Sequence, residues 1–275
     1  MWFQTLLPSL LPFMILSNFL VAIFAFRYIP AWFSHMMGFL TGLSHNGVYA
    51  FCLGLFCGYP MGAKVTADLY RRQAISKQEA QYLLTFSNCA SPAFLASFVL
   101  CQTLQSPQLL KTSCILYYLA NYLTSVVFRL YYRPSPSDQR KVSPAASRPD
   151  SSWMEALDTS IMNGFETITK LGGYIILFSI LSGFAKELLP DWGILKTLIL
   201  CATEITTGIT ILVNSGGSFL FCYVTAMSMT AFGGLCILAQ TKSMLQETDL
   251  SLKPYFFAKC CNMLITACLC LLFIL

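Results

Sequence analysis

Long apolar runs alternate with short polar stretches along most of the chain. Runs of about twenty apolar residues are typical of helices that span a membrane. They predict membrane spans over 3–26, 83–104, 116–132, 164–184, 218–240 and from 252 onward. Each half of the chain also contains one apolar run that is broken in its middle, at 36–73 and at 195–213. This pattern predicts an all-α, polytopic membrane protein.

The first broken run is the most distinctive stretch of the sequence. An apolar segment from Val48 to Cys57 ends at Gly58-Tyr59-Pro60-Met61-Gly62-Ala63-Lys64, whose proline and glycines cannot continue a helix. Ser76, with Glu79 three residues later, predicts the start of the next helix. That helix is interrupted in turn, because the polar and proline positions at 88–92 lie in the middle of a run long enough to cross a bilayer.

The second half repeats this outline. The sequence Glu204-Ile205-Thr206-Thr207-Gly208 stands where the first half has its Gly-Tyr-Pro break, and 228–235 stands where the first half has 88–95. A stretch rich in proline, serine and basic residues separates the halves and is typical of a solvated linker. The sequence therefore predicts a first repeat at 1–133, a linker at 134–152 and a second repeat at 153–275.

The distribution of basic residues predicts how the repeats cross the membrane, because Lys and Arg collect in cytoplasmic loops. If each broken run is a re-entrant hairpin, most basic loop residues fall on the linker side, Arg71 and Lys259 among them, and only Lys111, Lys186 and Lys196 fall opposite. Two full crossings would instead divide the basic residues almost evenly. With re-entrant hairpins, the two halves are inverted relative to one another, and each has three transmembrane helices and one hairpin. Interrupted helices at the midplane of inverted repeats are the usual build of a secondary transporter.

Composition supports a membrane protein and excludes other classes. Apolar residues make up 56% of the chain and charged residues 11%. The twelve cysteines show no Cys-x-x-Cys spacing and are expected to act as small hydrophobic residues. The net charge of +5 comes from residues that flank apolar runs, so no nucleic-acid partner is expected. The chain has no His-Glu-x-x-His cluster, Gly-x-Ser-x-Gly elbow or Walker loop, which predicts neither an enzyme nor a cofactor.

The breaks supply the candidate site residues. Lys64 follows a helix break, and an ionisable residue within a membrane is costly and functional by default. Backbone amides after Pro60 and Gly62 would present a helix N-terminus, which attracts carboxylate or phosphate. The predicted substrate-binding residues are Gly58, Tyr59, Pro60, Gly62, Lys64, Asn88, Ser91, Thr206, Thr207, Ser228 and Thr230. Glu204 is predicted to bind a coupling proton or sodium ion.

Structural alternatives stay open for several of these residues. Lys64 would pair with Asp68 on the same helix, as Glu166 would with Lys170, because residues four apart lie on one helix face. Glu204 would alternatively neutralise Lys64 across the two halves. The side chains at 88–91 would alternatively satisfy the backbone groups that the nearby proline leaves open.

Three motifs carry a resemblance to a known family. Gly58 to Lys64, Ile75 to Ala80 and Leu84 to Asn88 resemble the sporulation integral membrane protein YlbJ family, whose members contain nucleoside-recognition (Gate) domains. The segments 164–184 and 204–208 extend the resemblance through most of the chain. It implies two Gate-like repeats and a role in endospore formation, in which such a protein moves dipicolinic acid across the outer forespore membrane. The plan is also similar to that of concentrative nucleoside transporters, but this chain lacks the Gly-Gln-Thr-Glu run of their first hairpin.

Together, residues and resemblance predict a multi-pass protein of the cell membrane, with both termini outside and the linker in the cytoplasm. We expect it to carry a small anionic solute, dipicolinic acid first, by an elevator or alternating-access mechanism between hairpin tips and broken helices. A nucleoside or other small-solute transporter of the same fold, and a non-transporting sporulation scaffold, are the alternatives. The expected partners are the lipid bilayer, the solute, a coupling proton or sodium ion and a second copy of the chain.

Overall fold

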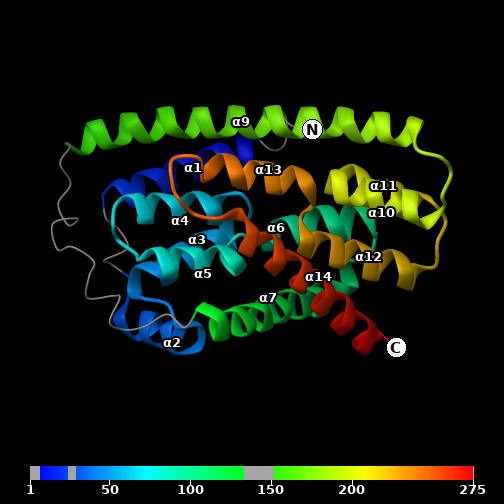
Figure 1. Cartoon of the computed structure of the whole chain (residues 1–275), viewed down its shortest axis with the longest axis horizontal. Helices are drawn as coiled ribbons and strands as arrows, with labels where there is room; N and C mark the ends of the chain where they lie inside the picture. The colour runs from blue at the N-terminus through cyan, green and yellow to red at the C-terminus, as the bar shows by residue number, and fades with distance from the viewer. Residues whose placement is uncertain (1–6, 24–28, 133–151, 275) are drawn as a thin grey trace.

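The computed structural model describes residues 7–23, 29–132 and 152–274, and within these ranges every regular element is helical. The elements form an elongated bundle whose long axis is followed by one helix, α9 (Trp153–Leu188) (Figure 1). A helix rises about 1.5 Å per residue, so the 36 residues of α9 extend about 54 Å. This is well beyond the ~30 Å of a bilayer's hydrocarbon core.

The helices of the first half are mostly short. They are α1 (Leu7–Ala22), α2 (Ala31–Thr41), α3 (His45–Cys57), α4 (Met61–Arg71), α5 (Lys77–Ser87), α6 (Pro92–Phe94), the π-helical segment η3 (Leu95–Thr103), the 3-10 turn η4 (Pro107–Leu109) and α7 (Leu110–Tyr132). In the second half, α9 is followed by α10 (Ile194–Thr203), α11 (Ile205–Asn214), α12 (Phe219–Phe232), α13 (Gly234–Met244) and α14 (Leu252–Ile274).

Four helical stretches of the described chain are long and apolar enough to cross a membrane. They are Lys77–Thr103, Trp153–Leu188, Phe219–Met244 and Leu252–Phe273. Each overlaps one of the predicted spans, at 83–104, 164–184, 218–240 and from 252 onward. The predicted span at 116–132 lies in α7, which is 23 residues long but does not meet the same criteria of length and composition. Of the predicted first span, the structure describes α1, and the positions at 3–6 and 24–26 lie outside the described residues.

Two pairs of short helices occupy the broken runs. α3 and α4 have 13 and 11 residues, and α10 and α11 have 10 each. At about 1.5 Å per residue, each of these helices extends between about 15 and about 20 Å, too short to cross the hydrocarbon core alone. The helices meet at Gly58–Pro60 and at Glu204, where the sequence predicts the breaks.

The part of the first broken run that precedes the Gly58 break, residues 36–57, was expected as one helix, and the structure divides it into two. Gly42 adopts the left-handed conformation, with φ of 78°, and ends α2. Ser44 then caps α3, because its side chain accepts a hydrogen bond from the Gly47 amide. Ser76 caps α5 as predicted, whereas Glu79 accepts a hydrogen bond from the Ser44 amide at 2.6 Å and so joins α5 to the start of α3.

The two long interrupted helices break in different ways. The first consists of α5, the non-helical residues 88–91, and α6 with η3. The second breaks between α12 and α13 at two consecutive glycines, Gly233 and Gly234, with φ of 86° and 79°. Both φ values lie in the left-handed region that glycine enters without the usual steric cost. This break falls inside the predicted stretch 228–235.

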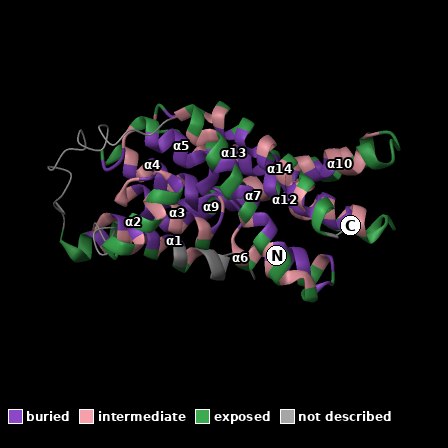
Figure 2. Ribbon diagram, turned by 90° about the horizontal axis from the view of Figure 1, so that it is seen from below, coloured by how far each residue is buried: buried purple, intermediate pink, exposed green. Residues whose placement is uncertain are grey.

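The two halves share one interior. α1 packs against α9, and α7 packs against α14, so the first and last helices of one half contact the first and last helices of the other. α4 of the first half contacts α13, and α11 of the second half contacts η3. Figure 2 shows the buried residues gathered along the middle of the bundle, where α3, α4, α5 and α13 lie. The halves are therefore interlocked and do not form separate cores.

Candidate functional site

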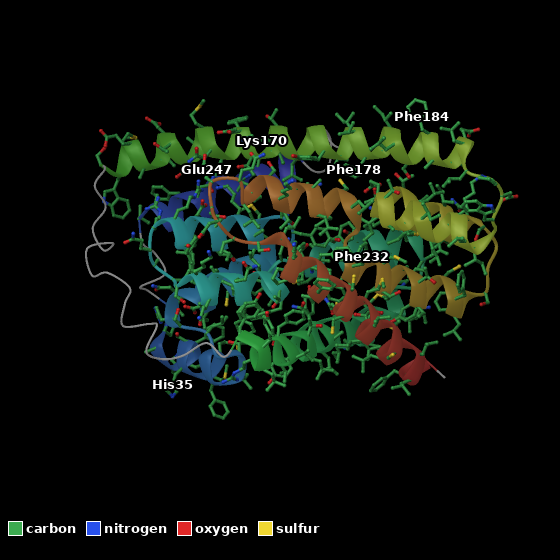
Figure 3. The ribbon with its side chains drawn as sticks, viewed as in Figure 1. His35, Lys170, Phe178, Phe184, Phe232 and Glu247 are labelled. Carbon is green, nitrogen blue, oxygen red and sulfur yellow. The ribbon has the colours of Figure 1, made fainter. Side chains whose placement is uncertain are left out.

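A polar cavity of about 420 Å³ lies between α1, α4, α9 and the end of α13. Its volume falls within the range of small-molecule sites, ~300–1,000 Å³. Seven charged side chains line it: Lys64, Asp68, Arg71 and Arg72 from α4 and its C-terminus, Glu166 and Lys170 from α9, and Glu247 after α13. Figure 3 shows Lys170 on α9 and Glu247 below that helix, whereas Phe184 points away from the bundle on the outer side of α9. Such a concentration of charge is unusual in so apolar a chain.

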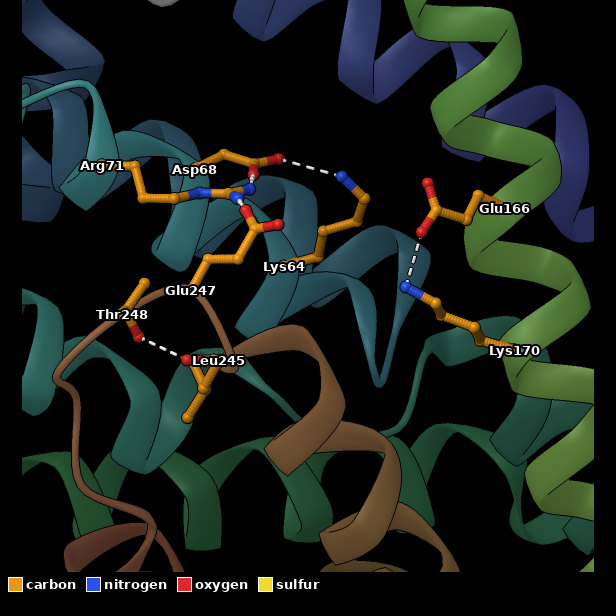
Figure 4. Close-up of polar contacts among 8 residues, drawn as sticks. All are labelled: Lys64, Asp68, Arg71, Glu166, Lys170, Leu245, Glu247 and Thr248. Atoms are coloured by element: carbon orange, nitrogen blue, oxygen red, sulfur yellow. Dashed lines mark hydrogen bonds and ion pairs between the residues drawn. The ribbon is translucent and has the colours of Figure 1, made fainter.

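The charged groups of the cavity form a partly paired network (Figure 4). Lys64 Nζ lies 3.1 Å from Asp68 Oδ2, and Arg71 binds both Asp68 and Glu247. On the opposite wall, Lys170 Nζ donates to Glu166 Oε1 at 2.6 Å. The two pairings expected from spacing, Lys64 with Asp68 and Lys170 with Glu166, are therefore both present.

The cavity carries more positive than negative charge. Four basic and three acidic side chains line it, which leaves one net positive charge. The side chains of Lys64 and Asp68 are only 12% and 13% exposed, so their charges are poorly screened by water. A small anion that enters this space would meet cationic groups whose present partners are carboxylates. Anion binding therefore fits the charge of the site.

A second polar region lies deeper in the bundle, where the interrupted helix of the first half breaks. Asn88 Oδ1 accepts a hydrogen bond from the Ala63 amide at 3.4 Å. Its Nδ2 donates to Thr241 Oγ1 at 2.9 Å and to the Tyr255 hydroxyl at 3.0 Å. One fully buried side chain thus joins α4, α13 and α14. We call the region around residues 88–91, with Tyr59 and Glu204, the junction.

Helix α7 satisfies the backbone that this break leaves open. The Ala90 amide donates to the Tyr117 hydroxyl at 2.9 Å, and the Tyr118 hydroxyl donates to the Ala90 carbonyl at 3.0 Å. Asn121 Nδ2 donates to the Phe86 carbonyl at 2.8 Å. Ser91 caps α6, because its Oγ accepts from the Phe94 amide. Buried backbone groups without such partners would cost several kcal/mol each in an apolar surrounding.

Close backbone contact fixes the tip of α3 and α4 against this break. A Cβ atom placed on Gly62 would lie 2.3 Å from the Ser87 carbonyl oxygen, and one on Gly54 would meet the same atom. A Cβ atom placed on Gly58 would lie 2.9 Å from the Ser91 amide nitrogen. Only glycine allows the two segments to approach this far. The predicted residues Gly58, Tyr59, Pro60 and Gly62 thus form one side of the junction, and Asn88 and Ser91 the other.

Glu204 lies between the two helices of the second short pair, where α10 ends and α11 begins. Its carboxylate accepts hydrogen bonds from the Thr206 amide at 3.1 Å, the Thr206 hydroxyl at 2.7 Å and the Thr207 amide at 2.8 Å. An acidic side chain is favourable at this position, because the N-terminus of a helix carries partial positive charge. The oxygens of Glu204 therefore bind the start of α11 and not Lys64, as the alternative of a pair across the halves required.

The other predicted residues of the second half bond within their own helix. Ser228 Oγ donates to the Val224 carbonyl at 2.7 Å, and Thr230 Oγ1 donates to the Ala226 carbonyl at 2.7 Å. Such bonds satisfy a hydroxyl without a ligand.

Tyr59 lies where the two halves meet. Its ring packs edge-on against Phe94, with ring centroids 6.1 Å apart. Its hydroxyl is buried without a hydrogen-bond partner in the described structure and interacts electrostatically with Glu204 and Cys236 of the second half. The predicted site residues are therefore divided between two places, with Lys64 at the cavity and most of the others at the junction.

Sequence reasoning missed Lys259. The sequence pattern places Lys259 among the basic residues of the cytoplasmic loops. This assignment is wrong, because Lys259 lies inside α14 and is 1% exposed. Its Nζ has no hydrogen-bond partner in the described structure and lies 5.4 Å from the centre of the Tyr255 ring. Helical spacing gave a usable signal, since Tyr255, Lys259, Asn262 and Thr266 fall on one face of an apolar helix.

Comparison with known proteins identifies one similar curated protein. The chain is 28% identical to the sporulation integral membrane protein YlbJ of Bacillus subtilis (strain 168), over 94% of this chain and 71% of that protein. No family model matches the chain, and no solved structure matches it. The likeness over nearly the whole chain confirms the resemblance that the motifs predict, and together with the long apolar helices it supports a location in the membrane.

Proposed function

We propose that the protein is a transporter that moves a small anionic solute across the membrane. The polar cavity carries this proposal, because a space of about 420 Å³ with one net positive charge opens inside an otherwise apolar helix bundle. Dipicolinic acid is the leading substrate by the family resemblance. Its two carboxylates match the forked donors of Arg71 and Arg72 and the ammonium groups of Lys64 and Lys170, and such charge-assisted bonds are the strong ones.

The charge of the cavity favours an anion over a nucleoside. A neutral nucleoside gains little from four basic side chains and would displace ion pairs without replacing their charge. A carboxylate would take the place of Asp68 beside Lys64 and keep the ammonium neutralised. Solute binding would thus exchange one ion pair for another, which is how a site can bind a charged solute and still release it.

The proposed mechanism is alternating access between two inverted Gate-like repeats, 1–133 and 153–275. Equivalent helices contact one another across the halves, α1 with α9 and α7 with α14, which supports a twofold relation. The contacts of α4 with α13 and of α11 with η3 are equivalent in the same way. The pairs α3–α4 and α10–α11 would be the re-entrant hairpins, with the interrupted helices at the midplane.

The orientation of the cavity follows from the predicted topology. Its α9 residues lie in the first half of that helix, which begins after the linker at 134–152. With the linker in the cytoplasm and both termini outside, the cavity would face the cytoplasm. The state described would be the inward-facing one, and Glu204 stays the proposed ion-coupling residue of the second hairpin.

Uptake of labelled dipicolinate into proteoliposomes tests the proposal. We expect uptake by the native protein, loss of uptake in Lys64→Ala, and unchanged uptake in Lys111→Ala, which removes an exposed lysine of α7 far from the cavity in sequence. A panel of nucleosides and small acids added as competitors would show the class of solute. Equal uptake by native protein and Lys64→Ala would contradict the assigned site. Absence of movement and of competition by any solute would favour the non-transporting scaffold.

A further inference from the structure

A stripe of buried polar side chains runs along the inner face of α14. Tyr255, Lys259, Asn262 and Thr266 are all fully buried or nearly so, and their spacing places them on one side of the helix. Lys259 Nζ, Asn262 Oδ1 and Thr266 Oγ1 have no hydrogen-bond partner in the described structure. Buried polar atoms normally have partners, so several orphaned atoms in one line require an explanation.

The stripe is attached to the junction at two points. The Tyr255 hydroxyl accepts the hydrogen bond from Asn88 Nδ2 at 3.0 Å. Asn262 Nδ2 donates to Asn121 Oδ1 at 3.3 Å, and Asn121 in turn holds the Phe86 carbonyl just before the break. Lys259 lies between Tyr255 and Asn262 in the sequence and on the same face of α14. Its amine interacts electrostatically with Cys89, in the break of the interrupted helix of the first half.

Lys259 has no counter-ion among the residues that the structure describes. None of the ion pairs of the described residues includes it, and its aromatic neighbour is the Tyr255 ring. The helices packed against α14 are α12, α7, α5 and α13, and their buried titratable side chains include Tyr82, Tyr117, Cys222, Tyr223 and Cys236. Cys89, just after α5, is the group that interacts electrostatically with Lys259. The carboxylate that these helices carry is Glu79 at the start of α5, and it accepts a hydrogen bond from the Ser44 amide. A charged lysine at this position would therefore be uncompensated, and a buried uncompensated charge costs several kcal/mol.

We propose that Lys259, in place of the Glu204 considered above, is the proton-binding site that couples transport, taking up a proton when the anionic solute reaches the junction and releasing it when the solute leaves. This inference rests on the proposed transport function. The solute supplies the negative charge that the ammonium lacks, so proton and anion each favour the binding of the other. Such coupling is reciprocal by thermodynamic necessity. Each solute bound adds one proton to the neutral amine of Lys259. The Asn262 and Thr266 oxygens that lack hydrogen-bond partners in the described structure would line the path of that proton.

Proteoliposomes that contain a trapped pH-sensitive dye test the inference with two simultaneous readouts. Labelled dipicolinate added outside reports solute movement, and the dye reports protons. In the native protein we expect the lumen to acidify as the solute enters. In Lys259→Met we expect exchange of solute for solute to persist while acidification falls to the level of protein-free vesicles. Lys253→Met is the matched control, because Lys253 lies on the same helix but is exposed, and it should behave as the native protein.

The two readouts separate the failure of this inference from that of the transport proposal. Solute entry without acidification in the native protein, or equal acidification in Lys259→Met, overturns the role of Lys259 and leaves transport intact. If Glu204→Gln alone loses acidification, the coupling role belongs to Glu204. Absence of solute entry in the native protein overturns the transport proposal, and this inference falls with it.

A second variant covers the case in which Lys259→Met fails to fold. Lys259→Arg keeps a cation at this position, but a guanidinium does not release its proton in a protein. Solute exchange should therefore persist in Lys259→Arg while acidification falls to the level of protein-free vesicles. Acidification by Lys259→Arg equal to that of the native protein contradicts the inference.

Discussion

The junction and the cavity are both polar regions of an apolar bundle, but they differ in the kind of polar residue and in its burial. At the junction, the polar side chains of Asn88, Tyr117 and Asn121 are buried and bonded to backbone groups or to other buried side chains. At the cavity, charged side chains such as Lys170 and Glu166 are 48% and 62% exposed and bond mainly to a neighbour on their own helix. Removing one partner of a buried hydrogen bond costs about 1–3 kcal/mol, whereas an exposed ion pair contributes about 0.2–1 kcal/mol. The buried hydrogen bonds of the junction therefore stabilise the fold more than the exposed ion pairs of the cavity do. An exposed pair such as Lys170 with Glu166 can be broken at little cost.

The strongest test of this difference is a methyl group placed between the two segments of the junction. In Gly62→Ala, the added Cβ would lie 2.3 Å from the Ser87 carbonyl oxygen, which is backbone and cannot move aside as a flexible side chain can. We expect a loss of about 3 kcal/mol in the free energy of unfolding. Unfolding in a denaturing detergent series measures this loss. Gly173→Ala on α9 is the control, since no atom lies within 4 Å of its added Cβ, and it should leave the protein as stable or slightly more stable.

A smaller loss is expected when Asn88 is shortened. Asn88→Ala leaves the Ala63 amide, Thr241 and Tyr255 without their partner, and should cost about 2–3 kcal/mol. The double variant with Thr241→Val sharpens the test, because Thr241 bonds to the same side chain. Its cost should be less than the sum of the two single costs by about 1 kcal/mol. Additive costs would mean that the two side chains do not cooperate across α4 and α13.

The cavity should respond in the opposite way, with function lost and stability kept. Lys170→Ala removes one exposed ion pair with Glu166 and should change the free energy of unfolding by less than about 0.5 kcal/mol. Uptake of the anionic solute should nevertheless weaken, because one of the four basic side chains of the cavity is gone. Stability and uptake measured on the same preparation decide the matter. A large loss of stability would show that the cavity, like the junction, holds the fold.

The smallest effect is expected at the loop that joins α13 to α14. Hydrogen bonds from Lys77 and then from Tyr70 lower the pKa of Asp249 below its ordinary value of 3.8. The folded state therefore binds this proton less readily than the unfolded state, so the contribution is complete well above pH 3.8 and is lost as the pH falls through the lowered pKa. Melting temperatures measured across this acidic range should fall slightly less in Asp249→Asn than in the native protein. An identical fall in both would show that the loop contributes nothing.

Features encoded locally could be predicted from the sequence. The breaks at Gly58–Pro60 and Glu204, the cap at Ser76 and the start of α14 at Leu252 all lie where the sequence places them. Each depends on one or two residues that cannot continue a helix or that satisfy its first amides. The same local reasoning predicted two of the ion pairs, because spacing along one helix determines them.

Features that depend on packing between distant segments could not be predicted in the same way. Lys64 and Lys170 line one cavity only because α4 and α9 face each other across it. The burial of Lys259 depends on how α14 lies against α5 and α7, and a count of charges along the chain cannot record it. Asn88 was expected to contact substrate, and its partners on α13 and α14 are visible only in the folded bundle.

The length of α9 determines how the bundle sits in lipid. Its first half exposes Trp153, Met154, Met162 and Phe165, and its second half exposes more apolar side chains, at Ile176, Leu177, Ile180, Leu181, Phe184 and Leu188. From residue 171 to its end the helix extends about 27 Å, close to the thickness of the hydrocarbon layer. If the second half lies in the hydrocarbon layer, the first half, with its charged residues, reaches the lipid headgroups and water. Under the proposed transport function, a solute would then reach the cavity by diffusion through the aqueous boundary, and only the remaining depth of the bilayer would require a moving protein.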